Sequence, residues 1–92
     1  MEISAFKARV EGIVQGVGFR FFTEDKAREY DLKGYVKNMY DGSVEVYAEG
    51  KKNILEKFLN DIKTGPRMSR VENTEVHWKE AENQYDSFII KY

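Results

Sequence analysis

The sequence of 92 residues has no cysteine, a single proline and no long hydrophobic run. Without cysteine, the chain has no thiol catalysis, thiolate metal site or disulfide bond, and it fits a reducing compartment, so we expect a cytoplasmic protein. A membrane span needs roughly 18 or more consecutive apolar residues, and no stretch approaches that length. The first residues also lack the basic and apolar regions of a signal peptide.

An excess of charge of one sign is missing as well. Fifteen basic and 16 acidic residues give a formal net charge of −1, and both signs are mixed along the chain. A nucleic-acid-binding surface would need a basic excess, so we expect neither a nucleic-acid nor a membrane partner. The length predicts one domain, residues 1–92, which can bury a core without disulfide or metal support. We expect this domain to act as a monomer.

Two kinds of apolar spacing divide the chain into strands and helices. A period of two, as at Phe6, Ala8 and Val10, is typical of a strand with one buried face. Apolar stripes at helical spacing predict a helix over about 19–30 and a second helix past Gly50 that ends near Thr64. The strands are expected at residues 3–10, 34–39, 43–49, 71–79 and 87–91.

The resulting order, β-α-β-β-α-β plus a terminal strand, predicts an α+β fold. It is the order of a ferredoxin-like two-layer sandwich, in which two helices cover one face of an antiparallel sheet. We expect the strand at 34–39 to lie beside the strand at 3–10. This architecture serves RNA-binding modules, regulatory domains, metal chaperones and enzymes, so the fold alone does not assign a function.

Glycines interrupt the chain between the first strand and the first helix. Gly16 and Gly18 can adopt positive φ, which lets successive backbone N–H groups turn toward one anion beside a helix N-terminus. Arg20 adds a planar cation suited to two phosphate oxygens. The alternatives are an ordinary strand-to-helix turn and a solvated arginine. A cation at a helix start is unfavourable unless an anion compensates it, which favours an anion site.

Two further polar residues need an interpretation. Asn38 ends the second strand, where it could simply bond a backbone group of the following turn, or it could orient a water molecule through its amide. His77 alternates with Val76 and Trp78, so we expect it on the solvent side of its strand and do not propose it as a base. No spacing of acidic residues distinguishes a metal site.

Two segments carry a resemblance to a known family. The first is Gly12-Ile13-Val14-Gln15-Gly16-Val17-Gly18-Phe19-Arg20, and the second is Gly34-Tyr35-Val36-Lys37-Asn38 followed by Gly42, Val44 and Gly50. The chain resembles the acylphosphatases in both segments, which together span about a third of its length. Two departures, Met39-Tyr40 before Asp41-Gly42 and Arg67 after Gly65-Pro66, lie outside the expected site.

The resemblance implies hydrolysis of acyl phosphates to a carboxylate and inorganic phosphate, with no metal or cofactor. It implies that Arg20 and Asn38 are catalytic and that Asn38 holds the attacking water. The phosphate would be bound by the segment Gln15, Gly16, Val17, Gly18, Phe19 and Arg20. The main alternative is a non-catalytic anion-binding ferredoxin-like module or a piece of a larger carbamoyl-transfer protein. A single-strand RNA binder is disfavoured by the balanced charge.

Overall fold

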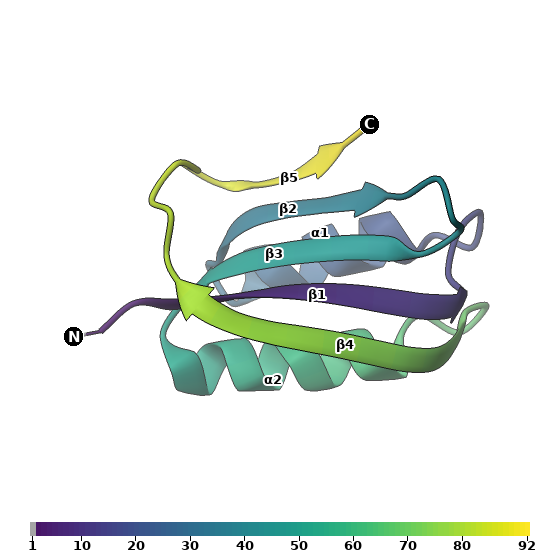
Figure 1. Ribbon diagram of the computed structural model, residues 1–92, viewed down its shortest axis with the longest axis horizontal. Helices are drawn as coiled ribbons and strands as arrows, with labels where there is room; N and C mark the ends of the chain where they lie inside the picture. Colours follow the sequence, from purple (N-terminus) through teal and green to yellow (C-terminus); the bar gives the residue numbers. More distant parts are fainter. Residues whose placement is uncertain (1) are drawn as a thin grey trace.

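In the computed structural model, which describes residues 2–92, five strands form one sheet and two helices cover one of its faces (Figure 1). This arrangement confirms the predicted ferredoxin-like sandwich. The elements are β1 (Ser4–Ile13), α1 (Phe19–Glu29), β2 (Lys33–Asn38), β3 (Val44–Gly50), α2 (Lys52–Thr64), β4 (Arg70–Glu80) and β5 (Phe88–Lys91). Within residues 2–92, no helix is long and apolar enough to span a membrane.

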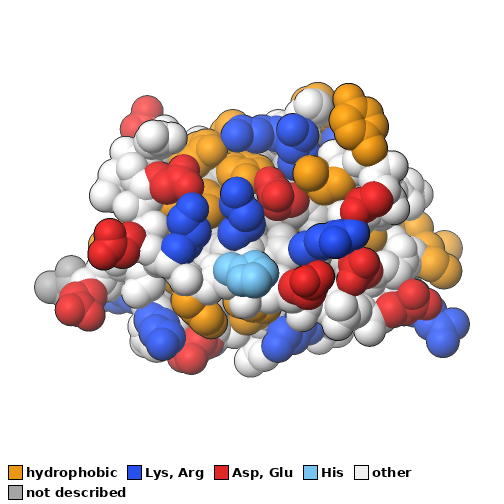
Figure 2. Space-filling view, in the orientation of Figure 1, with side chains coloured by type: hydrophobic (Ala, Val, Ile, Leu, Met, Phe, Trp, Pro, Cys, Tyr) orange, Lys and Arg blue, Asp and Glu red, His pale blue; other side chains and the backbone are white. Residues whose placement is uncertain are grey.

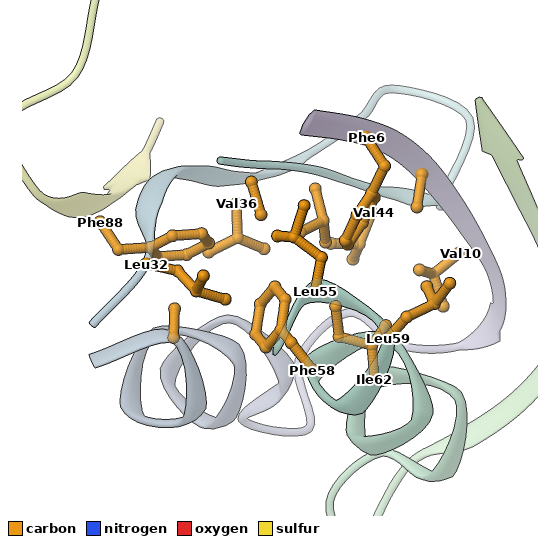
Figure 3. Close-up of a cluster of buried hydrophobic side chains, with 14 of the residues drawn as sticks. Phe6, Val10, Leu32, Val36, Val44, Leu55, Phe58, Leu59, Ile62 and Phe88 are labelled. Carbon is orange, nitrogen blue, oxygen red and sulfur yellow. The ribbon is translucent and has the colours of Figure 1, made fainter. Parts of the chain in front are cut away.

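The core lies between the sheet and the helices. The alternating side chains of β1 and β3 point toward the helices and are fully buried, as their period of two predicts. The apolar stripe of α2 meets them from the other layer (Figure 3). Ring contacts between Phe58 and both Phe6 and Phe88 join the two layers. The fully buried members include Phe6, Ala8, Val10, Val44, Val46, Ala48, Leu55, Phe58, Ile62 and Phe88.

The opposite face of the sheet is uncovered over most of its area. Figure 2 shows basic and acidic side chains interspersed on it around the single histidine, His77, which is exposed as expected. One satellite cluster interrupts these charges, because Tyr85 folds over the buried rings of Tyr35 and Tyr47. Burial, followed by its hydrogen bond to Glu49, raises the pKa of Tyr47.

The strand order corrects one expectation, because β2 does not lie beside β1. The order is β4-β1-β3-β2-β5, so β3 occupies the place between them and pairs antiparallel with both. A helix is about 10 Å wide and strands lie about 4.8 Å apart, so the crossover through α1 spans two strand positions. The β2–β3 hairpin then fills the gap. As a result β1 and β2 run in the same direction, and their last residues lie at the same end of the sheet.

The remaining differences concern strand length and direction. β1 continues to Ile13 instead of ending at Val10, because β4 pairs with it through the register Ile13↔Arg70. β5 pairs parallel with β2, so the sheet is not antiparallel throughout. The segment after β4 crosses to the far edge of the sheet before β5 begins, which reverses the chain direction (Figure 1).

Candidate active site

The loop between β1 and α1, residues 14–18, is the glycine loop. Gly16 has φ 75° and Gly18 has φ 78°, so both adopt the left-handed conformation that the sequence predicted. A Cβ atom added at either position would meet nothing within 4 Å. Glycine is therefore favoured here by the backbone angle and not by lack of space. Gly18 directly precedes α1, whose first turn has no side-chain cap, so its N–H groups remain available to an anion.

The glycine loop is fixed to the turn between β2 and β3. The Gln15 side-chain amide donates hydrogen bonds of 2.8 Å to the backbone carbonyls of both Met39 and Ser43. The loop and this turn lie close together because β1 ends, β2 ends and β3 begins at the same end of the sheet. In the strand order, β3 is next to β1 and β2 is next to β3. The Gln15 side chain thus holds the loop against the end of the strand that carries Asn38.

The turn itself is ordered by Asp41. Its carboxylate accepts hydrogen bonds from the Ser43 backbone N–H at 2.9 Å and the Ser43 hydroxyl at 2.6 Å, and it pairs with Arg9. These bonds, the Ser43 hydroxyl first and Arg9 last, lower the pKa of Asp41 below its ordinary value. Asp41 is therefore a charged turn residue that fixes the backbone to which Gln15 is bonded.

A hollow of about 230 Å³ lies between the glycine loop, the start of α1 and the end of β2. Of the residues predicted to form a site, it brings together Gly16, Gly18, Phe19, Arg20 and Asn38. Gln15 and Val17 do not line it. Two residues that the sequence did not suggest also border this space, the buried Val14 and the exposed Phe21.

Asn38 has an unusual environment in this hollow. Its Oδ1 atom is buried, and within residues 2–92 it has no hydrogen-bond partner. Buried polar atoms are nearly always bonded, so an unpartnered one needs an explanation such as a bound water or a catalytic role. The amide oxygen therefore accepts no bond from the following turn, one of the bonds that the strand-end alternative would allow.

Arg20, the second residue of α1, also lacks a protein counter-charge. Within residues 2–92 it forms no ion pair, and its guanidinium carbon lies 4.9 Å from the centre of the Tyr92 ring. Tyr92 borders a second hollow, of about 340 Å³, which meets the first at Asn38 and is lined by Lys37, Asn38, Met39, Tyr40 and Tyr92. Nothing in the sequence indicated this position for Tyr92, because it follows from the parallel pairing of β5 with β2.

The site thus combines uncapped N–H groups, an unpaired guanidinium and a buried amide oxygen. Such a set can bind a phosphate-sized anion and hold one water beside it. No cluster of three or more histidine, aspartate or glutamate side chains suited to a metal ion occurs between residues 2 and 92.

Comparison with known proteins identifies the family of this chain. A family model described as Acylphosphatase matches residues 6–90. The chain belongs to the acylphosphatase family. An acylphosphatase from Thermotoga maritima is 51% identical over 90 residues, which are 98% of this chain and 99% of the relative. The crystal structure of acylphosphatase from Bacillus subtilis superposes with a TM-score of 0.93 at 38% identity, and 97% of this chain and 99% of that one are covered.

A further likeness places the same fold inside a larger protein. Full-length HypF, in a phosphate- and nucleotide-bound crystal form, matches 99% of this chain with a TM-score of 0.91 and 35% identity, but the match covers only 12% of HypF. The Thermotoga relative, by contrast, is matched over nearly its whole length. The predicted family and activity are confirmed: this acylphosphatase is a hydrolase that acts on acid anhydrides.

Proposed function

We propose that the glycine loop and Arg20 bind the phosphoryl group of an acyl phosphate, and that Asn38 orients the water that attacks it. The observation that carries this assignment is that Asn38, a residue whose Oδ1 atom is buried and unpartnered, lines the same hollow as Gly16, Gly18 and Arg20. A binding site for phosphate alone would need no such atom. A hydrolase needs an acceptor that holds one water in place.

The phosphoryl group is held mainly by the backbone. The N–H groups of Gly16, Gly18, Phe19 and Arg20 belong to residues that line the hollow. The left-handed angles at Gly16 and Gly18 are of the kind that turns successive N–H groups toward one anion. Arg20 adds in-plane N–H donors for two oxygens of the phosphoryl group. These donors stabilise the charge that is spread over the equatorial oxygens in the loose transition state of phosphoryl transfer.

The water needs positioning more than activation. Asn38 Oδ1 accepts a hydrogen bond from the water, and the phosphoryl oxygens of the substrate take up the proton that attack releases. The leaving carboxylate departs without protonation, so no general acid is needed. His77 lies on the open face of the sheet and takes no part. This chemistry requires neither a metal ion nor an organic cofactor.

The experiment that tests this proposal is hydrolysis of acetyl phosphate and benzoyl phosphate by the purified protein, before and after dialysis against EDTA. We expect phosphate release at the same rate in both preparations. A phosphate monoester is the matched control, and it should be a poor substrate because its alkoxide leaving group needs an acid. Loss of turnover after EDTA treatment, with recovery on addition of Mg²⁺, would show that the metal-free mechanism is wrong.

A second candidate function is anion binding without turnover, as a module of a larger assembly. The likeness to HypF supports this candidate, because the match covers only 12% of HypF and the fold is therefore part of a longer chain in that protein. The same assay separates the two functions, because a binding module would bind inorganic phosphate and release none from acyl phosphates. We further propose that the protein acts as a cytoplasmic monomer, which light scattering after gel filtration would test for the oligomeric state.

A further inference from the structure

We propose that Tyr92 is a positioning residue, which holds the Arg20 guanidinium in the plane that presents its N–H groups to the phosphoryl oxygens. This inference rests on the role of Arg20 in the proposed function. The first observation is the contact itself, in which the Tyr92 ring lies 4.9 Å from the guanidinium carbon of Arg20. Such a cation–π contact is attractive within about 6 Å of the ring centre.

The geometry of the contact suits an anion-binding arginine. All the N–H donors of a guanidinium lie in its plane, so a ring stacked on one face leaves them free to bond oxygens. A carboxylate partner would instead occupy those donors. Within residues 2–92 Arg20 has no ion pair, so the ring of Tyr92 orients the cation without competing with the substrate.

The second observation is the pairing that brings Tyr92 to this place. β5 is parallel to β2, and their last register pair is Lys37↔Lys91. The residues that follow this pair along the chain are Asn38, the last residue of β2, and Tyr92, directly after β5, and both line the same hollow. The pairing of β5 with β2 therefore places Tyr92 in one hollow with Asn38 and in contact with Arg20, the two residues of the proposed mechanism.

The third observation is that the contact is exposed. Tyr92 keeps 88% of its accessible surface, so the packing of the core does not depend on it. Removing the ring should therefore leave the fold intact and release only the arginine. An exposed cation–π contact corresponds to a change of about 2- to 5-fold in binding.

The test compares Tyr92→Leu, Tyr92→Phe and the matched control Tyr40→Leu. Tyr40 borders the same hollow and is fully exposed, but no cation lies over its ring among the described contacts. Binding of inorganic phosphate is followed by NMR through the Gly16 and Gly18 amide signals, which needs no turnover. We expect Tyr92→Leu to weaken phosphate binding about 2- to 5-fold, and Tyr92→Phe and Tyr40→Leu to bind as the wild type does.

Two readouts separate positioning from a structural role. The Arg20 Nε–H signal of the phosphate-free protein should shift in Tyr92→Leu, through loss of the ring current, and stay near its wild-type place in Tyr92→Phe. The thermal midpoint should be the same in all variants. The inference is overturned if Tyr92→Leu binds phosphate normally, if Tyr92→Phe binds as weakly as Tyr92→Leu, or if Tyr40→Leu loses as much. A failure of the proposed function would appear separately, as absence of acyl phosphate hydrolysis by the wild type.

Discussion

The first turns of the two helices have several features in common. Neither α1 nor α2 has a side-chain cap or an acidic residue in its first turn. Each has a cation in its first turn, Arg20 in α1 and Lys52 in α2. Each cation lies over an aromatic ring, at 4.9 Å from the centre of Tyr92 and 5.2 Å from the centre of Trp78. Each helix start borders a hollow of its own. The hollow at α2 has a volume of about 300 Å³, and the hollow at α1 has a volume of about 230 Å³.

The backbone before each helix is different. Lys51 precedes α2 with an extended conformation, φ −68° and ψ 139°, whereas Gly18 precedes α1 in the left-handed conformation, φ 78° and ψ 14°. The surroundings differ too. The hollow at α2 is lined by the acidic Asp31, which repels anions. The hollow at α1 is lined instead by Asn38, whose amide oxygen is unpartnered. An uncapped helix start and a nearby cation are thus common to both helices. The left-handed loop and Asn38 are the features that distinguish the proposed site at α1.

The largest effect is expected from Arg20→Lys, which keeps the charge but removes the planar pair of donors. Lysine is a point charge that cannot bond two oxygens in parallel, so kcat/KM for an acyl phosphate should fall by roughly 10³-fold or more, the scale on which an arginine acts in phosphoryl transfer. The inhibition constant for inorganic phosphate should rise with it. Arg28→Lys makes the same change in the last turn of α1, where Arg28 pairs with Glu24, and should leave both constants unchanged.

The comparison of the two helix starts also shows which sequence arguments were informative. The glycine spacing predicted the left-handed loop, because few other residues tolerate positive φ, and both glycines adopt it. The misplaced cation was a weaker argument, since Lys52 occupies a similar position without a comparable loop. Asn38 lines the hollow as expected, although the expectation that β2 lies beside β1 was wrong. The reason is that β1 and β2 end at the same end of the sheet even with β3 between them.

Other parts of the site were beyond prediction from local sequence. The hydrogen bonds from Gln15 to the β2–β3 turn join residues 24 and 28 positions apart, and the cation–π contact of Arg20 with Tyr92 joins residues 72 positions apart. Their positions depend on the order of strands in the sheet, which the period of the apolar residues does not specify. The periodicity did specify the buried faces, since a one-residue error in β1 or β3 would have exposed the core.

The next effect in size is expected from Asn38→Ala, which tests the feature that α2 lacks. The variant keeps the glycine loop and Arg20, so inorganic phosphate should inhibit at nearly the wild-type concentration. Only kcat should fall, by roughly 10² to 10³, the scale for loss of one positioned polar group. Steady-state kinetics with phosphate as competitor measure both quantities. If phosphate affinity were lost while kcat stayed normal, Asn38 would belong to the binding of phosphate and not to the positioning of water.

A smaller effect is expected at Gly18, the residue whose backbone distinguishes the two helix starts. Gly18→Val should lower phosphate affinity and kcat/KM together by roughly 10², because a β-branched residue resists the left-handed angle and the N–H groups turn away. Gly18→Asn is the matched variant, since asparagine tolerates that angle and a Cβ there meets no other atom within 4 Å. It should retain activity to within about tenfold. Equal activity of the two variants, with the fold verified by circular dichroism, would mean that backbone angle at Gly18 does not matter.

The smallest effect is expected from Lys52→Gln, which removes the cation from the start of α2. If a cation beside a free helix start made an anion site, this change would weaken phosphate binding as a change at Arg20 does. We expect kcat, KM and the phosphate inhibition constant to stay within experimental error. The unfolding free energy should change by at most about 1 kcal/mol, because two effects oppose each other. Loss of the repulsion between Lys52 and the helix dipole raises the unfolding free energy, and loss of the contact between Lys52 and Trp78 lowers it. A rise in the phosphate inhibition constant comparable to that of Arg20→Lys would show that the start of α2 also binds the substrate, and the contrast between the two helix starts would then be lost.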